Sequence, residues 1–344
     1  MLKKYLIKFV KTVLPLLLGV YLVWHSFSSL SDKDLETFYN KLGEANYFWI
    51  VFALLFSVIA LFSRAYRWSL ALEPIGHQTK FWHRYHAIMI GYLINFTIPR
   101  AGEASRAAML YKSEGVPFGT SFGTIVAERA VDFIVLSGIG LLTAFLAYDD
   151  FFILLNEVQT FDFGSSVNSS SSDDYSLKSF FLFVGVIFVI TGIIFFFKNK
   201  KFQKKAIEFL KNVFAGLLSI FKVKSPSKYI LHTFIIWVAY LLMFVFPFFC
   251  LEETANFPLK GYLLGFIAGS LGIILTNGGI GTYPILVGLV VAFYIKGEHP
   301  EQALAIGTAL GWIIWLSQTL LMIILGLISL ALLPNNFEKT DEPN

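Results

Sequence analysis

Three charged residues at helical spacing interrupt an apolar stretch of this sequence. An apolar run leads into "NFTIPRAGEASR" (95–106), which contains Arg100, Glu103 and Arg106. Residues three apart share one face of a helix, and Pro99 suits the first turn of such a helix because a missing N–H is harmless there. A helix N-terminus that points into a membrane can bind an anion through its dipole and free N–H groups, here with Arg100 beside it.

Arginine is well suited to this role because its planar fork can hold a phosphate through two hydrogen bonds. The motif therefore predicts a site for a lipid headgroup. Glu103 is expected to pair with Arg100 or Arg106, or to receive a cationic headgroup. The alternative interpretation is a cytoplasmic surface helix whose charges are solvated.

A second charged motif, "AERAVD", lies about ten residues into the apolar segment 118–147 and contains Glu128, Arg129 and Asp132. Glu128 and Asp132 are four residues apart, so both carboxylates face one side of a helix. Each charge at the centre of a bilayer costs about 2.5–3.5 kcal/mol. We therefore expect these acids to meet the arginines of the first motif in a polar centre, and a purely structural ion network is the alternative.

The composition places these motifs in a membrane protein. Of 344 residues, 56% are hydrophobic and 15% are charged, whereas a soluble domain carries about 25% charged residues. The apolar runs are continuous rather than alternating, which predicts an all-α polytopic fold and excludes a β-barrel. The single cysteine, Cys250, excludes internal disulfides and cysteine-based metal sites. We expect no cofactor, no metal and no nucleic acid partner, and an enzyme is not favoured.

The apolar runs divide into two kinds. Full spans are predicted at 10–29, 46–63, 118–147, 179–197, 229–250 and 301–332. Two further segments, 85–112 and 261–296, are interrupted by charged or glycine-rich sequence and are predicted to be re-entrant hairpins. The alternative is eight ordinary spans. We expect one transmembrane domain (1–344), with a first half at 10–197 and a second half at 229–332.

The charges of the loops predict the orientation of the spans. The segment 198–228 holds nine lysines against one glutamate and is expected to be an amphipathic helix on the inner leaflet, whereas 149–176 is acidic and should face outward. The chain after the second span, with Arg64, Arg67 and Arg84, is assigned to the cytoplasmic side. Both termini should then be cytoplasmic, in the plasma (inner) membrane.

The two halves contain similar stretches. "GYLINFTIPRAGEASR" (91–106) is echoed by "GSLGIILTNGGIGTYP" (269–284), each with a Gly-x-Leu start and a glycine-containing breaker. The similarity predicts an inverted repeat, typical of transporters with a site near the midplane, although chance recurrence in glycine-rich sequence is the alternative. A glycine-rich break must line a cavity or be buried in protein. The residues expected to do so are Asn277, Gly278, Gly279 and Gly281.

At "PRAGEASRAAML", "AERAVD" and "NGGIGTYP" the chain resembles the transmembrane flippase-like domain of lysylphosphatidylglycerol synthases and their stand-alone relatives, over about residues 10–330. The resemblance implies movement of lipids between leaflets. It implies these matching polar positions: Arg100, Glu103, Arg106, Glu128, Arg129 and Asp132. We expect a stand-alone member without the aminoacyl-transferase domain.

The sequence therefore predicts a flippase-like or scramblase-like transporter. Its expected partners are membrane lipids, either an anionic phospholipid or a polyprenyl-phosphate lipid. One alternative is a membrane-embedded transferase that uses Glu128 or Asp132 as a base on a lipid-linked substrate. The other is a structural partner of a lipid-modifying enzyme.

Overall fold

The computed structural model describes residues 17, 19–24, 27–28, 30–98, 101–160 and 223–334, with the backbone alone for 155–160. All regular elements within these residues are helices, which confirms the all-α class. Several predictions lie outside the described residues, namely the span at 179–197, most of the basic segment 198–228, most of the acidic loop 149–176, and Arg100. The span at 10–29 is described only in part.

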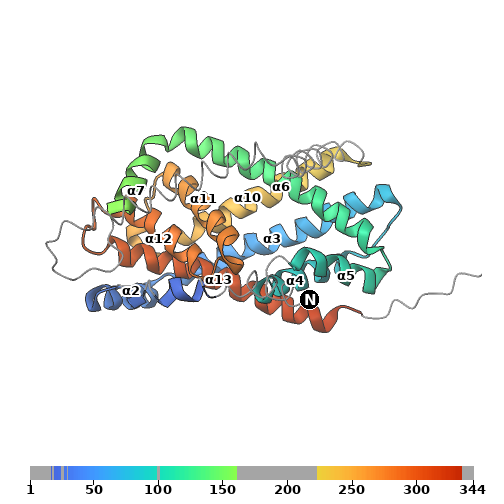
Figure 1. Cartoon of the computed structure of the whole chain (residues 1–344), viewed down its shortest axis with the longest axis horizontal. Helices are drawn as coiled ribbons and strands as arrows, with labels where there is room; N and C mark the ends of the chain where they lie inside the picture. Colours follow the sequence, from blue (N-terminus) through green and yellow to red (C-terminus); the bar gives the residue numbers. More distant parts are fainter. Residues whose placement is uncertain are drawn as a thin grey trace, which may run out of the picture.

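Four long helices run along the long axis of the molecule (Figure 1). They are α3 (Tyr47–Leu72), α6 (Phe118–Leu146), α10 (Pro226–Val245, continued by the 3₁₀ turn η2, Phe246–Cys250) and α13 (Ala303–Leu332). In the described part of the chain, these four are long and apolar enough to cross a membrane. They correspond to four of the six predicted spans.

Two pairs of shorter helices lie between the long ones. The first pair, called the first hairpin below, is α4 (Phe81–Thr97) and α5 (Gly102–Glu114). The second hairpin is α11 (Leu259–Leu275), the turn η4 (Asn277–Gly279) and α12 (Thr282–Ile295). None of the four helices exceeds 17 residues, and about 20 residues are needed to cross a bilayer.

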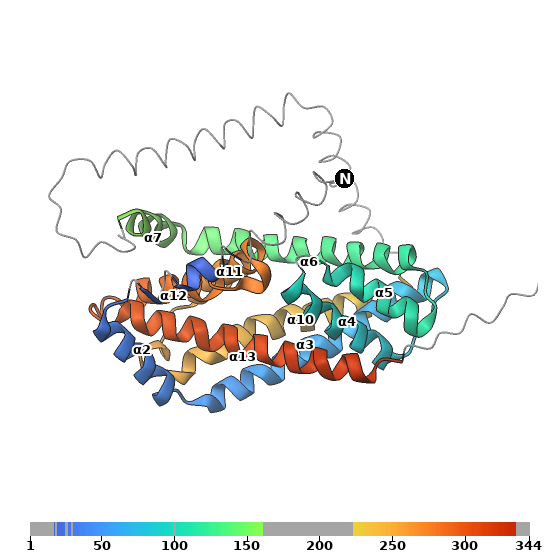
Figure 2. The ribbon, with the colours of Figure 1, turned by 60° about the horizontal axis from the view of Figure 1, so that its bottom comes forward.

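The two hairpins occupy opposite halves of the long axis in both views, and η4 contacts α4 (Figures 1 and 2). Their bounds agree with the predicted hairpin segments 85–112 and 261–296 to within a few residues. Entry into the membrane from opposite sides, and the inverted repeat itself, stay predictions.

The remaining helices flank this bundle. They are α2 (Asp32–Glu44), α7 (Tyr148–Thr160) and the single turns η1 (Glu73–Ile75) and η3 (Glu252–Thr254). Helix α2 occupies most of the segment between the first two predicted spans. Ser31 and Asp34 make a capping box that starts this helix, and α2 packs against α13.

The predicted end of the second span was wrong, whereas the cytoplasmic side assigned to Arg64, Arg67 and Arg84 stays a prediction. The second span was predicted to end at residue 63, but α3 continues to Leu72, and Arg64 and Arg67 are buried within it. Arg84 is also buried, in α4, where its Nε donates to the carbonyl of Ala65 at 3.0 Å. The helix can continue through these charges because Asp132 of α6 pairs with Arg64 and Arg67. A count of loop charges does not detect such a partner.

Glycines allow two of the helix pairs to touch through their backbones. A Cβ built on Gly307 of α13 would lie 2.3 Å from the carbonyl oxygen of Gly288 in α12. In the first hairpin, a Cβ on Gly102 would lie 2.4 Å from the carbonyl oxygen of Gly91. These contacts set the distance between paired helices, and the second fixes how α5 sits against α4.

The contact between α12 and α13 can be tested with Gly307→Ala. The added methyl meets backbone that cannot rotate away, and overpacking of this kind costs about 1–3 kcal/mol. We expect a lower midpoint of thermal unfolding in detergent. Gly138→Ala in α6 is the matched control, because nothing lies within 4 Å of its Cβ. Equal midpoints for the two variants would contradict the close packing.

Candidate functional site

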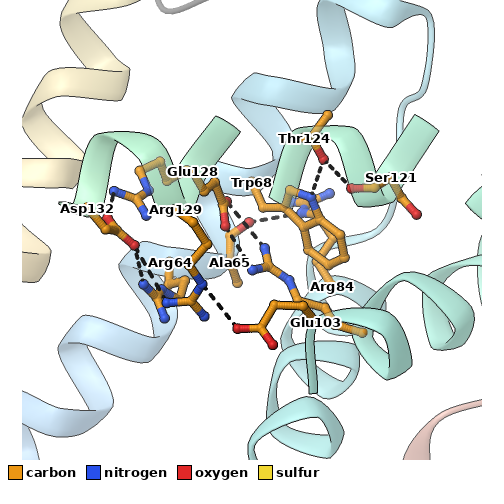
Figure 3. Close-up of polar contacts among 12 residues, drawn as sticks. Arg64, Ala65, Trp68, Arg84, Glu103, Ser121, Thr124, Glu128, Arg129 and Asp132 are labelled. Atoms are coloured by element: carbon orange, nitrogen blue, oxygen red, sulfur yellow. Dashed lines mark hydrogen bonds and ion pairs between the residues drawn. The ribbon is translucent and has the colours of Figure 1, made fainter. Parts of the chain in front are cut away.

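A buried ion pair between Arg106 of α5 and Glu128 of α6 lies at the centre of the site. The two Nη atoms of Arg106 bind the two carboxylate oxygens of Glu128 at 2.8 and 3.2 Å. The guanidinium of Arg106 also stacks on Trp68 of α3, with its Cζ 3.7 Å from the ring centroid. Trp68 is fixed in turn, since its Nε1 donates to Thr124 Oγ1 at 2.9 Å (Figure 3).

Asp132 lies one helical turn further along α6 and forms ion pairs with two arginines of α3. Arg64 Nη2 is 2.6 Å from Asp132 Oδ2, and Arg67 Nη1 is 2.8 Å from Oδ1. Arg64 also donates to the hydroxyl of Tyr92 in α4, and Arg67 donates to Thr233 Oγ1 in α10 at 3.2 Å. These contacts connect α3, α4, α6 and α10 in one buried network.

Glu103 and Arg129 form a looser pair at the rim of this network. Arg129 Nε lies 3.3 Å from Glu103 Oε1, and the two side chains are 44% and 29% exposed, respectively. Arg129 Nη1 is also 3.9 Å from Asp132 Oδ2. Figure 3 shows this contact, and the exposed fractions make it the most accessible ion pair of the cluster among the described residues.

The structure brings together five of the six predicted polar residues: Glu103, Arg106, Glu128, Arg129 and Asp132. Arg100 lies outside the described residues. Helix α5 begins at Gly102 rather than directly after Pro99. Among the described contacts of Glu103, the partner is Arg129 and not the expected Arg106.

Sequence reasoning missed Arg64, Arg67 and Tyr92. A signal for the two arginines was present, because Arg64 and Arg67 are three residues apart and therefore share a helix face. They were left out of the second span because it was predicted to end at residue 63. Tyr92 carried no signal, since tyrosines are frequent in this chain.

A small pocket opens beside the network, between α3 and the helices α4, α5 and α6. Its volume is about 20 Å³, enough for about one water molecule. It is lined by Arg64, Ile88, Gly91, Tyr92, Asn95, Gly102, Glu103, Arg106 and Arg129. Asn95 Oδ1 accepts a hydrogen bond from the N–H of Gly102 at 2.7 Å, so the N-terminus of α5 is held at the pocket wall.

The network carries more positive than negative charge. Within the described residues, four arginines (64, 67, 106 and 129) face three carboxylates (103, 128 and 132), a balance of 4 − 3 = +1. The Nε atoms of Arg64 and Arg106, both pocket residues, are buried without an acceptor. A buried donor without a partner costs about 1–3 kcal/mol. An anion beside the pocket would neutralise the surplus charge and could supply acceptors for such donors.

The predicted residues of the second hairpin do not line this pocket. Asn277 and Gly279 are buried, and the carbonyl of Gly278 accepts a hydrogen bond from Trp315 Nε1 at 2.8 Å. The three glycines Gly278, Gly279 and Gly281 all have positive φ, which explains why this turn needs glycine. The break is therefore packed against protein in this structure.

The central ion pair can be tested by removing one or both partners. Glu128→Leu leaves the Arg106 cation buried and unpaired, which we expect to destabilise the protein by about 3–5 kcal/mol. The double variant Arg106→Met/Glu128→Leu should recover much of that loss, because no unpaired charge remains. Unfolding in detergent measures both. Glu103→Gln is the control at the exposed rim, and a double variant no more stable than Glu128→Leu would contradict direct pairing.

Comparison with known proteins places the chain in a family. Residues 12–326 match the family described as the lysylphosphatidylglycerol synthase TM region. A UPF0104 membrane protein of Methanocaldococcus jannaschii is 23% identical over 330 residues, which cover 90% of each chain. No solved structure matches the chain. The match covers most of the sequence, including both hairpins and all four long helices except the last residues of α13, and this chain is therefore a membrane protein of the lysylphosphatidylglycerol synthase TM region family.

Proposed function

We propose that this protein moves a lipid with an anionic, phosphate-containing headgroup between the two leaflets of its membrane. The observation that carries the proposal is the surplus of arginine over carboxylate around a pocket inside the helix bundle. A phosphate group suits this site because its oxygens accept charge-assisted hydrogen bonds from arginine. An anionic phospholipid and a polyprenyl-phosphate lipid share this chemistry.

The rim of the pocket is the place where a headgroup can enter. Glu103 holds Arg129 only loosely, at 3.3 Å and with both side chains partly exposed. A phosphate can displace Glu103 from Arg129 at little cost, since exposed ion pairs contribute up to about 1 kcal/mol. The inner contacts, Arg106 with Glu128 and both Arg64 and Arg67 with Asp132, are buried and stay in place. The surplus positive charge comes from the two arginines that share Asp132.

Binding of a whole headgroup requires the first hairpin to shift. A pocket of about 20 Å³ holds about one water, which is less than a phosphate group occupies. Helices α4 and α5 are shorter than a span and are joined to each other by a glycine contact. Because Arg106 ties α5 to Glu128 of α6, the shift would be confined to the first turn of α5, which carries Glu103. The acyl chains would stay in the lipid while the headgroup passes the arginines.

The transferase alternative needs a carboxylate that is free to accept a proton. Glu128 is held by both Nη atoms of Arg106, and Asp132 lies between Arg64 and Arg67. Both carboxylates are therefore already occupied by arginines, and neither is placed to take a proton from a substrate. The arrangement therefore supports transport over transfer.

We also propose that the protein lies in the inner membrane with cytoplasmic termini, on the loop charges alone.

Lipid translocation in proteoliposomes tests the proposal. Labelled anionic phospholipid, zwitterionic phospholipid and polyprenyl phosphate would be compared with wild-type protein and Arg129→Gln. This variant removes the surplus charge at a half-exposed position, so it should fold, and we expect at least a tenfold lower rate. Lys33→Gln, an exposed change outside the cluster, is the control. If no lipid moves, or Arg129→Gln moves lipid as fast as wild type, the transporter proposal is wrong.

Glu103→Gln should have the opposite effect to Arg129→Gln and raise the translocation rate at low lipid content. The neutral amide competes less for Arg129, so we expect the half-maximal lipid concentration to fall about two- to fivefold, in line with a rim ion pair of up to about 1 kcal/mol. The titration of translocation rate against lipid content measures it. A weaker apparent affinity would show instead that Glu103 contacts the headgroup directly.

A further inference from the structure

We propose that the turn of the second hairpin, residues 276–282, is a second subsite for an anionic headgroup, and that the ring of Phe96 covers it in this structure. This inference rests on the proposed function and extends it. It assigns a ligand to a segment that the arginine pocket does not include.

The first observation is the backbone of the turn. Gly278, Gly279 and Gly281 have φ of +60°, +78° and +73°. The N–H groups of Gly279 and Ile280 donate within the turn, to the carbonyls of Thr276 and Asn277 at 3.4 and 3.3 Å, so they are not donors for a ligand. The turn leads directly into α12, whose N-cap, Gly281, provides no side-chain cap. The first N–H groups of α12 therefore lack intrahelical acceptors and carry the positive end of the helix dipole.

The second observation is Asn277, at the start of the same turn. Its side chain is buried, with the residue 7% exposed, and its Nδ2 has no acceptor among the described residues. An amide N–H₂ is a pure donor, and leaving it buried without a partner costs about 1–3 kcal/mol. A phosphate oxygen is the kind of acceptor that this group lacks.

The turn is also held in shape by contacts that leave the Asn277 amide unused. Thr276 Oγ1 and Thr282 Oγ1 are hydrogen-bonded at 2.6 Å, and Thr282 Oγ1 donates to the carbonyl of Gly272 at 2.7 Å. Trp315 Nε1 donates to the carbonyl of Gly278. These bonds join the end of α11 to the start of α12, so the donors of the turn are fixed before any ligand arrives.

Phe96 separates this turn from the arginine pocket. A Cβ built on Gly278 would lie 2.7 Å from the Phe96 ring, so the ring rests directly on the turn. The preceding residue, Asn95, lines the arginine pocket. The last turn of α4 thus contacts both places. The Gly281 end of the turn packs instead against Gly19, Leu22 and Val23. In the proposal, a rotation of the Phe96 side chain connects the Asn277 end of the turn to the arginine pocket. A headgroup could then pass from the first hairpin to the second.

The number of binding sites tests the inference without relying on transport. The full-length protein in detergent would be titrated calorimetrically with dihexanoyl phosphatidic acid, a short-chain lipid. We expect one site per chain in wild type and two in Phe96→Ala. Adding Asn277→Asp to Phe96→Ala should return the count to one, because the new carboxylate repels the phosphate. Phe145→Ala, at a residue 83% exposed, is the control and should keep one site.

The outcomes separate this inference from the proposed function. A folded Phe96→Ala variant that still binds one lipid overturns the second subsite and leaves the transporter proposal standing. Arg106→Gln should remove the first site alone. If it removes every site in Phe96→Ala, the turn binds nothing by itself and the inference fails.

Translocation gives a second measure. Asn277→Asp should slow the proteoliposome rate about tenfold, from repulsion of the headgroup in a low-dielectric setting, while binding at the arginine pocket changes less than twofold. Asn40→Asp, the same change at an exposed position of α2, should leave the rate unchanged. A wild-type rate in Asn277→Asp would overturn the inference.

Discussion

The high free energy of an unpaired charge in an apolar interior determines how this bundle is assembled. Arg64 and Arg67 on α3, and Arg106 on α5, are buried among helices that are otherwise apolar. Each pairs with a carboxylate of α6: Arg106 with Glu128, and Arg64 and Arg67 with Asp132, which they share. Three helices must therefore adopt one relative height and rotation, because a shift by one turn would leave several charges unpaired. The same requirement leaves a positive remainder where the pocket opens.

The family, the helical class and four long helices could be predicted because they depend on local pattern. Continuous apolar runs and the charged motifs are visible without knowledge of neighbours. The spacing of Glu128 and Asp132 on one face of α6 also indicated a polar centre. What failed depended on contacts between distant segments. Arg64 looked like the end of a span because its partner, Asp132, lies 68 residues further along the chain.

The first hairpin shows the same division between local and distant information. Its position followed from the short apolar run and the glycine after it. The partner of Glu103 did not follow, since Arg106 is nearer in sequence but turns toward Glu128, where it gains two hydrogen bonds and the face of Trp68. The looser position at the rim then falls to Arg129. The contacts that a side chain makes in the fold therefore decide its partner, and the distance along the sequence does not.

The balance of +1 in the arginine network has an electrical consequence. Counted over the described residues, a monoanionic headgroup would cancel this charge while it lies at the pocket. Because the arginines stay in place in the proposed transport, the charge that crosses the membrane field would be that of the headgroup. A transmembrane voltage acts on such a charge with about 2.3 kcal/mol per 100 mV. Under the proposal, a transmembrane voltage would therefore act on the step that carries the lipid, while the arginines would stabilise the headgroup on its way without moving through the field themselves.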